Sequence, residues 1–265
     1  MYNHFQLAKK YLRYYFTASN GKGHGVHSPF VFAFIKNVLN DKKEYSCYNK
    51  IESRRSALQA GTSVIEVEDF GAGSTVIKSK QRVVRDIANS SLKPRKFAQL
   101  LFRIVHYYKP NIVLELGTSM GITTSYLACG NEAAKIYTCE GSASIAAIAQ
   151  TTFNELQLKN IELVPCDFTN TLPPLLSAIG KVDLAFIDGN HRRKPTLAYF
   201  KQLLTHSSAT SILIFDDIHW SKEMELAWLE IQEHPAVTGT VDLFFIGLVF
   251  VNPDFKVKQH YTIRF

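Results

Sequence analysis

The stretch Ile112-Val-Leu-Glu-Leu-Gly-Thr-Ser-Met-Gly121 decides the fold of this chain. Its mostly apolar first half predicts a buried strand, and the glycines at 117 and 121 predict a turn that leads directly into a helix. Such a turn brings backbone N–H groups and a helix N-terminus up to a ligand, while Glu115 supplies a negative acceptor nearby. The stretch therefore indicates a cradle for a nucleotide-type cofactor.

Other kinds of glycine turn fit this stretch less well. A phosphate-binding loop needs a lysine for the β- and γ-phosphates, and no lysine lies between Gly117 and Lys135. A dinucleotide fingerprint needs G-x-G-x-x-G, but Ser119 stands where its middle glycine would be. The alternative to a cofactor cradle is that this glycine turn only connects a strand to a helix.

The sequence downstream repeats the pattern of a buried strand that ends in an acid. Further apolar runs cover residues 135–140, 161–166, 182–187 and 210–215, and helical stretches separate them. The acids at the ends of the five runs are Glu115, Glu140, Asp167, Asp188 and Asp216. Because the carboxyl ends of parallel strands face one crevice, we expect these acids to converge. A single such acid is equally well explained as a helix cap.

The motif E-x-G-x-x-x-G at Glu115 to Gly121 resembles the first motif of class I S-adenosylmethionine-dependent methyltransferases, in the form found in small-molecule O-methyltransferases. The resemblance covers about residues 95–251 and implies an α/β, Rossmann-like, doubly wound sheet. Seven strands are implied, mostly parallel, with the last strand antiparallel and supplied by a hairpin over 240–251; residues 256–265 follow as a tail. We expect a helical N-terminal cap over 1–94 and the methyltransferase domain over 95–265.

The resemblance also implies which residues hold S-adenosylmethionine. The turn would contact the cofactor, Glu140 would accept from its ribose, Asp167 and Phe168 would hold the adenine, and Ser91 would reach the methionine part. The full set of cofactor-binding residues is Ser91, Glu115, Gly117, Thr118, Ser119, Gly121, Glu140, Gly141, Asp167, Phe168 and Asp188.

Metal-dependent relatives of the catechol and macrolide-sugar types hold Mg²⁺ with acids after the fourth and fifth strands. The matching residues are Asp188, Asp216 and Asp217, and their hard oxygens suit Mg²⁺. In such relatives a general base removes the proton of the hydroxyl. His219 resembles that base and is assigned as catalytic with Asp188, although a cap or a pairing with an acid explains His219 equally well. His191 is the weaker candidate, because Arg192, Arg193 and Lys194 indicate an exposed helix start.

The N-terminal part differs from the rest in charge. Residues 1–110 hold 19 Lys and Arg against 7 Asp and Glu, a balance of +12 within a total of +7. Helical spacing predicts a basic, aromatic helix over 5–15, a helix from Ser28-Pro29 to Leu39, and another over 96–108. Asp69-x-Gly71-x-Gly73 resembles the cofactor motif, but no strand pattern surrounds it. We interpret it as a structured loop between helices. Whether this loop also lies over the cofactor site and contacts the cofactor stays open at this point.

Composition sets the remaining expectations. No apolar run approaches the length of about 18 residues that a membrane span needs, and the N-terminus lacks a signal-peptide pattern. The four cysteines show no metal-binding spacing, so reduced thiols and a cytoplasmic protein are expected. We expect a small-molecule substrate and a homodimer through the N-terminal helices, with nucleic acid disfavoured. The alternatives are a metal-independent methyltransferase with another acceptor and an RNA-associated cofactor-binding protein.

Overall fold

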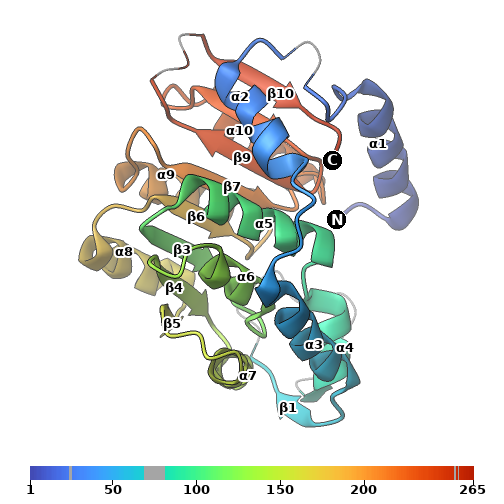
Figure 1. Cartoon of the computed structure of the whole chain (residues 1–265), viewed down its shortest axis with the longest axis vertical. Coiled ribbons are helices and arrows are strands. Elements are labelled where there is room, and N and C mark those ends of the chain that lie inside the picture. The colour runs from blue at the N-terminus through green and yellow to red at the C-terminus, as the bar shows by residue number, and fades with distance from the viewer. Residues whose placement is uncertain (24–25, 69–80, 254, 256) are drawn as a thin grey trace. The chain divides into compact units, whose positions relative to one another are not determined.

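The computed structural model of the chain describes residues 1–23, 26–68, 81–253, 255 and 257–265 (Figure 1). The chain divides into two compact units, residues 42–175 and residues 1–41 with 176–265. The helices are α1 (His4–Thr17), α2 (Pro29–Phe34), the π-helical η1 (Ile35–Leu39), α3 (Ser46–Ala60), α4 (Val84–Ser91), α5 (Arg95–Tyr108), α6 (Ile122–Gly130), α7 (Ala143–Glu155), α8 (Phe168–Ile179), α9 (Arg193–Thr205) and α10 (Lys222–Glu233). The strands are β1 (Val64–Glu66), β2 (Gln81–Val83), β3 (Ile112–Leu116), β4 (Lys135–Glu140), β5 (Ile161–Pro165), β6 (Leu184–Ile187), β7 (Ile212–Asp216), β8 (Gly239–Asp242), β9 (Ile246–Phe250) and β10 (Gln259–Thr262).

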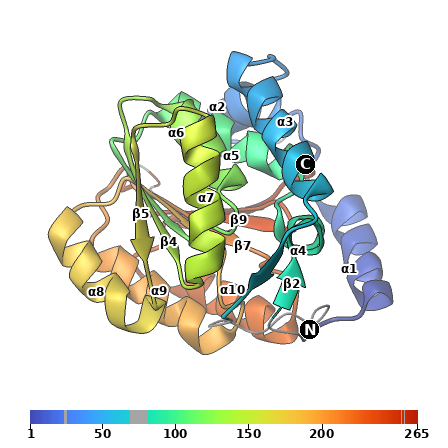
Figure 2. The same cartoon turned by 90° about the horizontal axis from the view of Figure 1, so that it is seen from below.

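The unit of residues 42–175 is built on three parallel strands. The strand β4 lies between β3 and β5, and its residue Ile136 is level with Val113 on one side and Ile161 on the other. Figure 2 shows α7 running beside β4 and β5. The helices α5 and α6 pack closely, because Gly130 has no side chain: a Cβ there would lie 2.8 Å from the side chain of Val105. The antiparallel pair β1 and β2 adds a small separate sheet.

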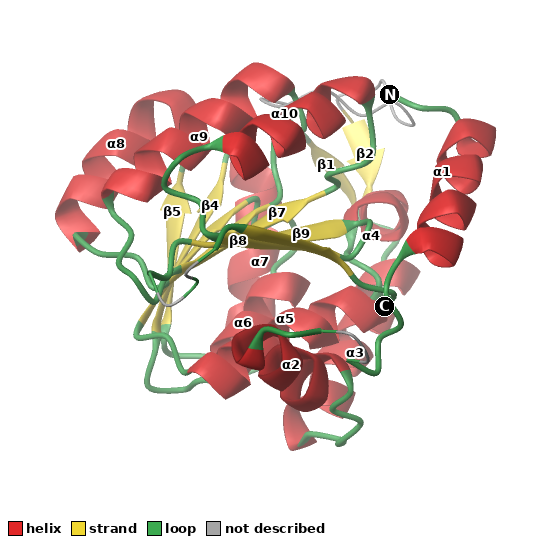
Figure 3. Ribbon diagram, turned by 90° about the horizontal axis from the view of Figure 1, so that it is seen from above, coloured by secondary structure: helices red, strands yellow, loops and turns green. Residues whose placement is uncertain are grey.

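The second unit contains the antiparallel part of the fold. The strands β6 and β7 are parallel, whereas β9 pairs antiparallel with both β7 and β8. Trp228 of α10 lies against Gly247 of β9, and Phe30 of α2 contacts Phe250 of the same strand at 4.9 Å between ring centroids. Successive side chains of a strand alternate between its faces, so α10 and α2 cover opposite faces of β9, as Figure 3 shows.

The structure confirms the predicted fold class, α/β with a mostly parallel sheet and an antiparallel strand from the 240–251 hairpin. The tail is an addition to the seven expected strands: residues 259–262 form β10, which pairs in parallel with β8. Periodicity missed it because its four residues contain no apolar run. The three predicted N-terminal helices correspond to α1, to α2 with η1, and to α5. The predicted boundary at residue 94 stays a prediction.

The remaining expectations concern the second glycine motif, the cysteines and membrane-spanning segments. The Asp69 to Gly73 motif lies outside the described residues, and the described chain next to it forms β1 and β2. All four cysteines are free thiols, as expected. Within the described residues, none of the helices is both long and apolar enough to cross a bilayer.

Candidate active site

The glycine turn between β3 and α6 adopts backbone angles that its sequence anticipates. Gly117, Ser119 and Gly121 all have positive φ, at 103°, 49° and 81°. The first and last are glycines, which reach this region without steric cost. The N–H groups of Gly117 and Thr118 donate to the carbonyl of Cys139, at 3.0 and 3.1 Å. These bonds fix the turn against the end of β4.

Glu115 is fully buried at the end of β3. Its Oε2 accepts from the hydroxyl of Thr124 on α6 and from that of Thr138 on β4, the second at 2.6 Å. Hydrogen bonds to a buried carboxylate are necessary, because a buried charge without them is strongly unfavourable. The described contacts of Glu115 thus join β3, β4 and α6. Its predicted contact with a cofactor stays a prediction.

Glu140 connects the turn to the next helix. One carboxylate oxygen accepts from the backbone N–H of Ser119 at 2.9 Å, and the other accepts from the N–H of Ser142 at 3.0 Å, just before α7. The hydroxyl of Ser91, at the end of α4, lies 3.1 Å from that of Ser119. Three residues of the predicted cofactor set therefore meet at this turn, although they are far apart in the sequence.

Asp167 follows β5 and caps α8. Its carboxylate accepts from the N–H of Thr169 at 3.0 Å and from the side chain of Asn170 at 2.6 Å. The structure thus shows the capping role that was the alternative for such an acid. Phe168 is half-buried beside it, and Gly141 is half-buried after β4. Their predicted contacts with adenine and ribose stay predictions.

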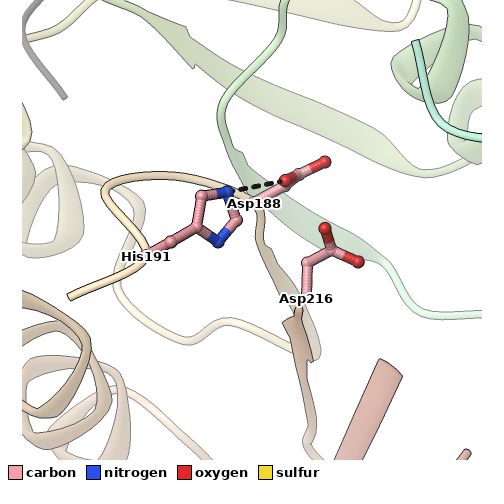
Figure 4. A group of neighbouring side chains, drawn as sticks. All are labelled: Asp188, His191 and Asp216. Carbon is pink, nitrogen blue, oxygen red and sulfur yellow. Dashed lines mark ion pairs between the residues drawn. The ribbon is translucent and has the colours of Figure 1, made fainter. Parts of the chain in front are cut away.

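Asp188, His191 and Asp216 gather at the carboxyl ends of β6 and β7 (Figure 4). One potential ligand atom from each lies within 4.8 Å of the others. The His191 ring faces Asp188, with its Nε2 3.5 Å from a carboxylate oxygen. Asp216 is 2% exposed. Two carboxylates this close in a largely buried place repel each other, which favours a cation between them.

Asp217, the third predicted metal ligand, is not in this group. It has φ 53°, and its N–H donates to the carbonyl of Phe245 at 2.7 Å. Its assignment stays a prediction. Sequence reasoning placed His191 second among the histidines, because the cations after it indicated a solvated helix start. The signal that could have identified it is the short D-x-x-H spacing, which allows a turn to bring the imidazole back to Asp188.

His219 lies between two carboxylates. Its Nε2 is 2.7 Å from Asp242, and its Nδ1 is 3.3 Å from Glu225. Burial lowers the pKa of His219, but the hydrogen bonds and charges of the two acids outweigh it and raise the pKa above its ordinary value. The ring also stacks on Phe244. This is the pairing with an acid that was the alternative to a general base, and the base assignment itself stays a prediction.

The Glu225 carboxylate extends this network to the N-terminus. It accepts from the hydroxyl of Tyr2 at 2.7 Å and from Lys10 of α1 at 2.9 Å. Burial raises the pKa of Glu225, but the bonds from Tyr2, Lys10 and His219 lower it below its ordinary value. The network holds α1 on this unit, together with Tyr14, whose hydroxyl donates to the carbonyl of Ile263.

Part of the chain matches a known protein family. Residues 114–218 match the family Methyltransf_24, described as a methyltransferase domain. The match begins within β3 and ends after β7, so it includes the glycine turn and the acids at 140, 167, 188 and 216. This part of the chain therefore resembles a methyltransferase domain.

One curated relative is the tRNA (guanine-N(7)-)-methyltransferase of Mycoplasma mobile, 29% identical over 126 residues. The aligned part is 43% of this chain, and the chain spans 63% of the length of that relative. Similar solved structures include the O-methyltransferase of Bacillus cereus, with 18% identity, coverage of 83% and 97% of the two chains and a TM-score of 0.55. The O-methyltransferase TomG of Streptomyces achromogenes has 16% identity, coverage of 79% and 91% and a TM-score of 0.56. The chain therefore shares the fold of these O-methyltransferases.

Proposed function

We propose that the chain transfers the methyl group of S-adenosylmethionine to a hydroxyl oxygen of a small molecule, with help from a divalent cation. The observation that carries the proposal is the turn from Gly117 to Gly121, which lies inside the matched methyltransferase region and is tied to Glu140. The solved structures of similar fold include O-methyltransferases in complex with S-adenosylmethionine and with its product SAH.

The cofactor, when bound, supplies an electrophilic methyl group on a sulfonium. In this proposal the N–H groups of the turn and of the start of α6 face it, since a helix N-terminus attracts negatively charged groups such as a carboxylate. Glu140 accepts from the ribose hydroxyls. Its carboxylate is already oriented by the N–H groups of Ser119 and Ser142, so little ordering is needed on binding.

Asp188 and Asp216 fit a divalent cation by the chemistry of their donors. Both offer carboxylate oxygens, which hard cations such as Mg²⁺ prefer. The cation, when bound, lowers the pKa of the acceptor hydroxyl and orients it. Asp188 then has three predicted roles: it belongs to the cofactor-binding set, it is a metal ligand, and it is catalytic. His219 would take the hydroxyl proton only if its Nε2 left Asp242.

Calorimetric titration with S-adenosylmethionine and with SAH tests the first half of the proposal. We expect dissociation constants at micromolar levels or below for the wild type. Glu140→Ala should weaken binding by about 1 to 3 kcal/mol through lost hydrogen bonds, whereas Glu162→Ala, on the neighbouring strand β5 and paired with Lys135, should not. No heat with either compound, or equal affinity for both variants, would refute the cofactor assignment.

Chelation tests the second half. Turnover of a catechol-type or sugar acceptor should fall on addition of EDTA and return with Mg²⁺ or another divalent ion. Asp216→Ala should remove this response and leave SAH affinity unchanged. Activity indifferent to chelator would instead support the metal-independent alternative.

A second candidate acceptor is RNA. The curated relative named above carries a tRNA methyltransferase name, and residues 1–110 have a charge balance of +12. Phosphate contacts make RNA binding weaken steeply with added salt. Tight tRNA binding at low salt that decreases in this way would favour this candidate. The absence of binding at low salt would exclude it.

A further inference from the structure

The third donor beside Asp188 and Asp216 is a nitrogen. We propose that His191 is a ligand of the divalent cation and that it makes the site prefer a transition metal such as Mn²⁺ or Co²⁺ over Mg²⁺. This inference rests on the proposed cation between the two carboxylates but not on the cofactor or the methyl acceptor. It replaces an expected oxygen donor, Asp217, by an imidazole.

The geometry supports a shared ion. One potential ligand atom from each of the three residues lies within 4.8 Å of the others, and the His191 ring faces Asp188 in Figure 4. Two atoms that bind one metal at about 2.0 to 2.2 Å lie at most a little over 4 Å apart, so small side-chain movements bring all three into coordination.

Burial and charge support the same conclusion. Asp216 is 2% exposed, and the Asp188 and His191 side chains are 20% and 21% exposed. Burial disfavours a second negative charge beside the first unless a cation compensates for it. A metal ion does so and leaves the imidazole neutral, as a ligand must be.

The His191 ring also contacts an aromatic side chain. His191 contacts the indole of Trp220 at 5.6 Å between ring centroids. The backbone N–H of Trp220 donates to the carbonyl of Asp217 at 3.0 Å. The contact limits the directions that the ring can take. A ligand whose orientation is fixed before binding coordinates with less loss of entropy.

The donor set determines the metal preference. Mg²⁺ favours oxygen donors and retains several waters, whereas imidazole suits transition metals. Three protein ligands also leave coordination positions open at a metal. An acceptor hydroxyl could occupy one of them. Without a metal, a protonated His191 paired with Asp188 would give the same contacts, and the experiment must separate these two cases.

Electron paramagnetic resonance of the full-length protein with Mn²⁺ makes this distinction. The free Mn²⁺ signal gives the affinity, and electron spin-echo envelope modulation reports whether a ¹⁴N nucleus is bonded to the ion. We expect ¹⁴N modulation in the wild type, its loss in His191→Ala, and at least tenfold weaker Mn²⁺ binding in that variant. His4→Ala, on exposed α1, serves as the matched control and should behave as the wild type does.

Competition with Mg²⁺ tests the preference. We expect Mg²⁺ to displace Mn²⁺ from the wild type only in large excess, and His191→Ala to reduce that excess. The inference is overturned if ¹⁴N modulation is absent from the wild type or persists in His191→Ala. It is also overturned if Asp217→Asn weakens Mn²⁺ binding while His191→Ala does not. SAH titration of the same samples separates the outcomes, because SAH binding without Mn²⁺ binding refutes the metal site alone.

Discussion

Substitution of Gly121 by alanine tests whether the glycine turn is shaped by packing as well as by backbone conformation. Gly121 has φ 81°, and a Cβ there would lie 2.6 Å from the Cε1 atom of Phe153 and 3.3 Å from the Cα atom of Ala149. Both contacts are on α7. A methyl group at this position therefore forces α6 and α7 apart or moves the Phe153 ring, which is 1% exposed.

Two penalties add at this position. An L-residue in the left-handed region costs roughly 1 to 2 kcal/mol, and insertion of a methyl group into a close-packed core costs about 1 to 3 kcal/mol more. We expect Gly121→Ala to lower the free energy of unfolding by about 2 to 5 kcal/mol in urea denaturation.

The chain provides a matched control. Gly180, after α8, has φ 75°, and a Cβ there would meet nothing within 4 Å. Gly180→Ala should therefore show only the backbone penalty. The double variant Gly121→Ala, Phe153→Leu should recover part of the loss relative to the sum of the single variants, because the smaller side chain leaves room. Equal destabilisation by Gly121→Ala and Gly180→Ala, with no coupling to Phe153, would refute the reasoning.

Two further predictions concern buried polar groups. Thr138→Val removes a hydroxyl that donates to buried Glu115 and should destabilise the protein by about 1 to 3 kcal/mol. Thr151→Val, on an exposed face of α7, is the control. Equal effects of the two substitutions would show that the hydrogen bond to Glu115 does not stabilise the fold. His219 has a raised pKa, so its bonds to Asp242 and Glu225 stabilise the fold fully below the unfolded pKa of about 6.5 and lose their effect as pH rises through the folded value. The difference in unfolding free energy between wild type and His219→Gln should accordingly shrink from pH 6 to pH 9, and a constant difference would show that the imidazolium does not matter.

Much of the fold could be predicted from the sequence because its strands are short, buried and mostly parallel. The runs at 112–116 and 212–216 are mostly apolar and carry an acid at or next to their last residue, so they mark both the strand and the edge at which it ends. Gly121 could also be predicted as part of a turn before a helix, and the structure adds the reason for a glycine there, a positive φ beside the Phe153 ring. The strand β10 could not, because its four residues alternate between half-buried and exposed and have no apolar run.

The candidate site was less predictable because side-chain partners come from remote parts of the chain. Thr138 supports Glu115 across 23 positions, and Ser91 meets Ser119 across 28. Neither threonine nor serine carries a sequence signal for such a contact. The acids could be placed at an edge of the sheet by topology, but not divided into cofactor acceptors, caps and metal ligands.

The two histidines show why residue type and position do not determine a role. His219 stands near the predicted metal acids, but both of its nitrogens face carboxylates and its pKa is raised. His219 must leave one of these carboxylates before it can take a proton from an acceptor or bind a metal. His191 has one nitrogen near Asp188 and a ring contact with Trp220. The sequence singled out His219 by its position after the acids, whereas the geometry places His191 among the donors that could hold a metal.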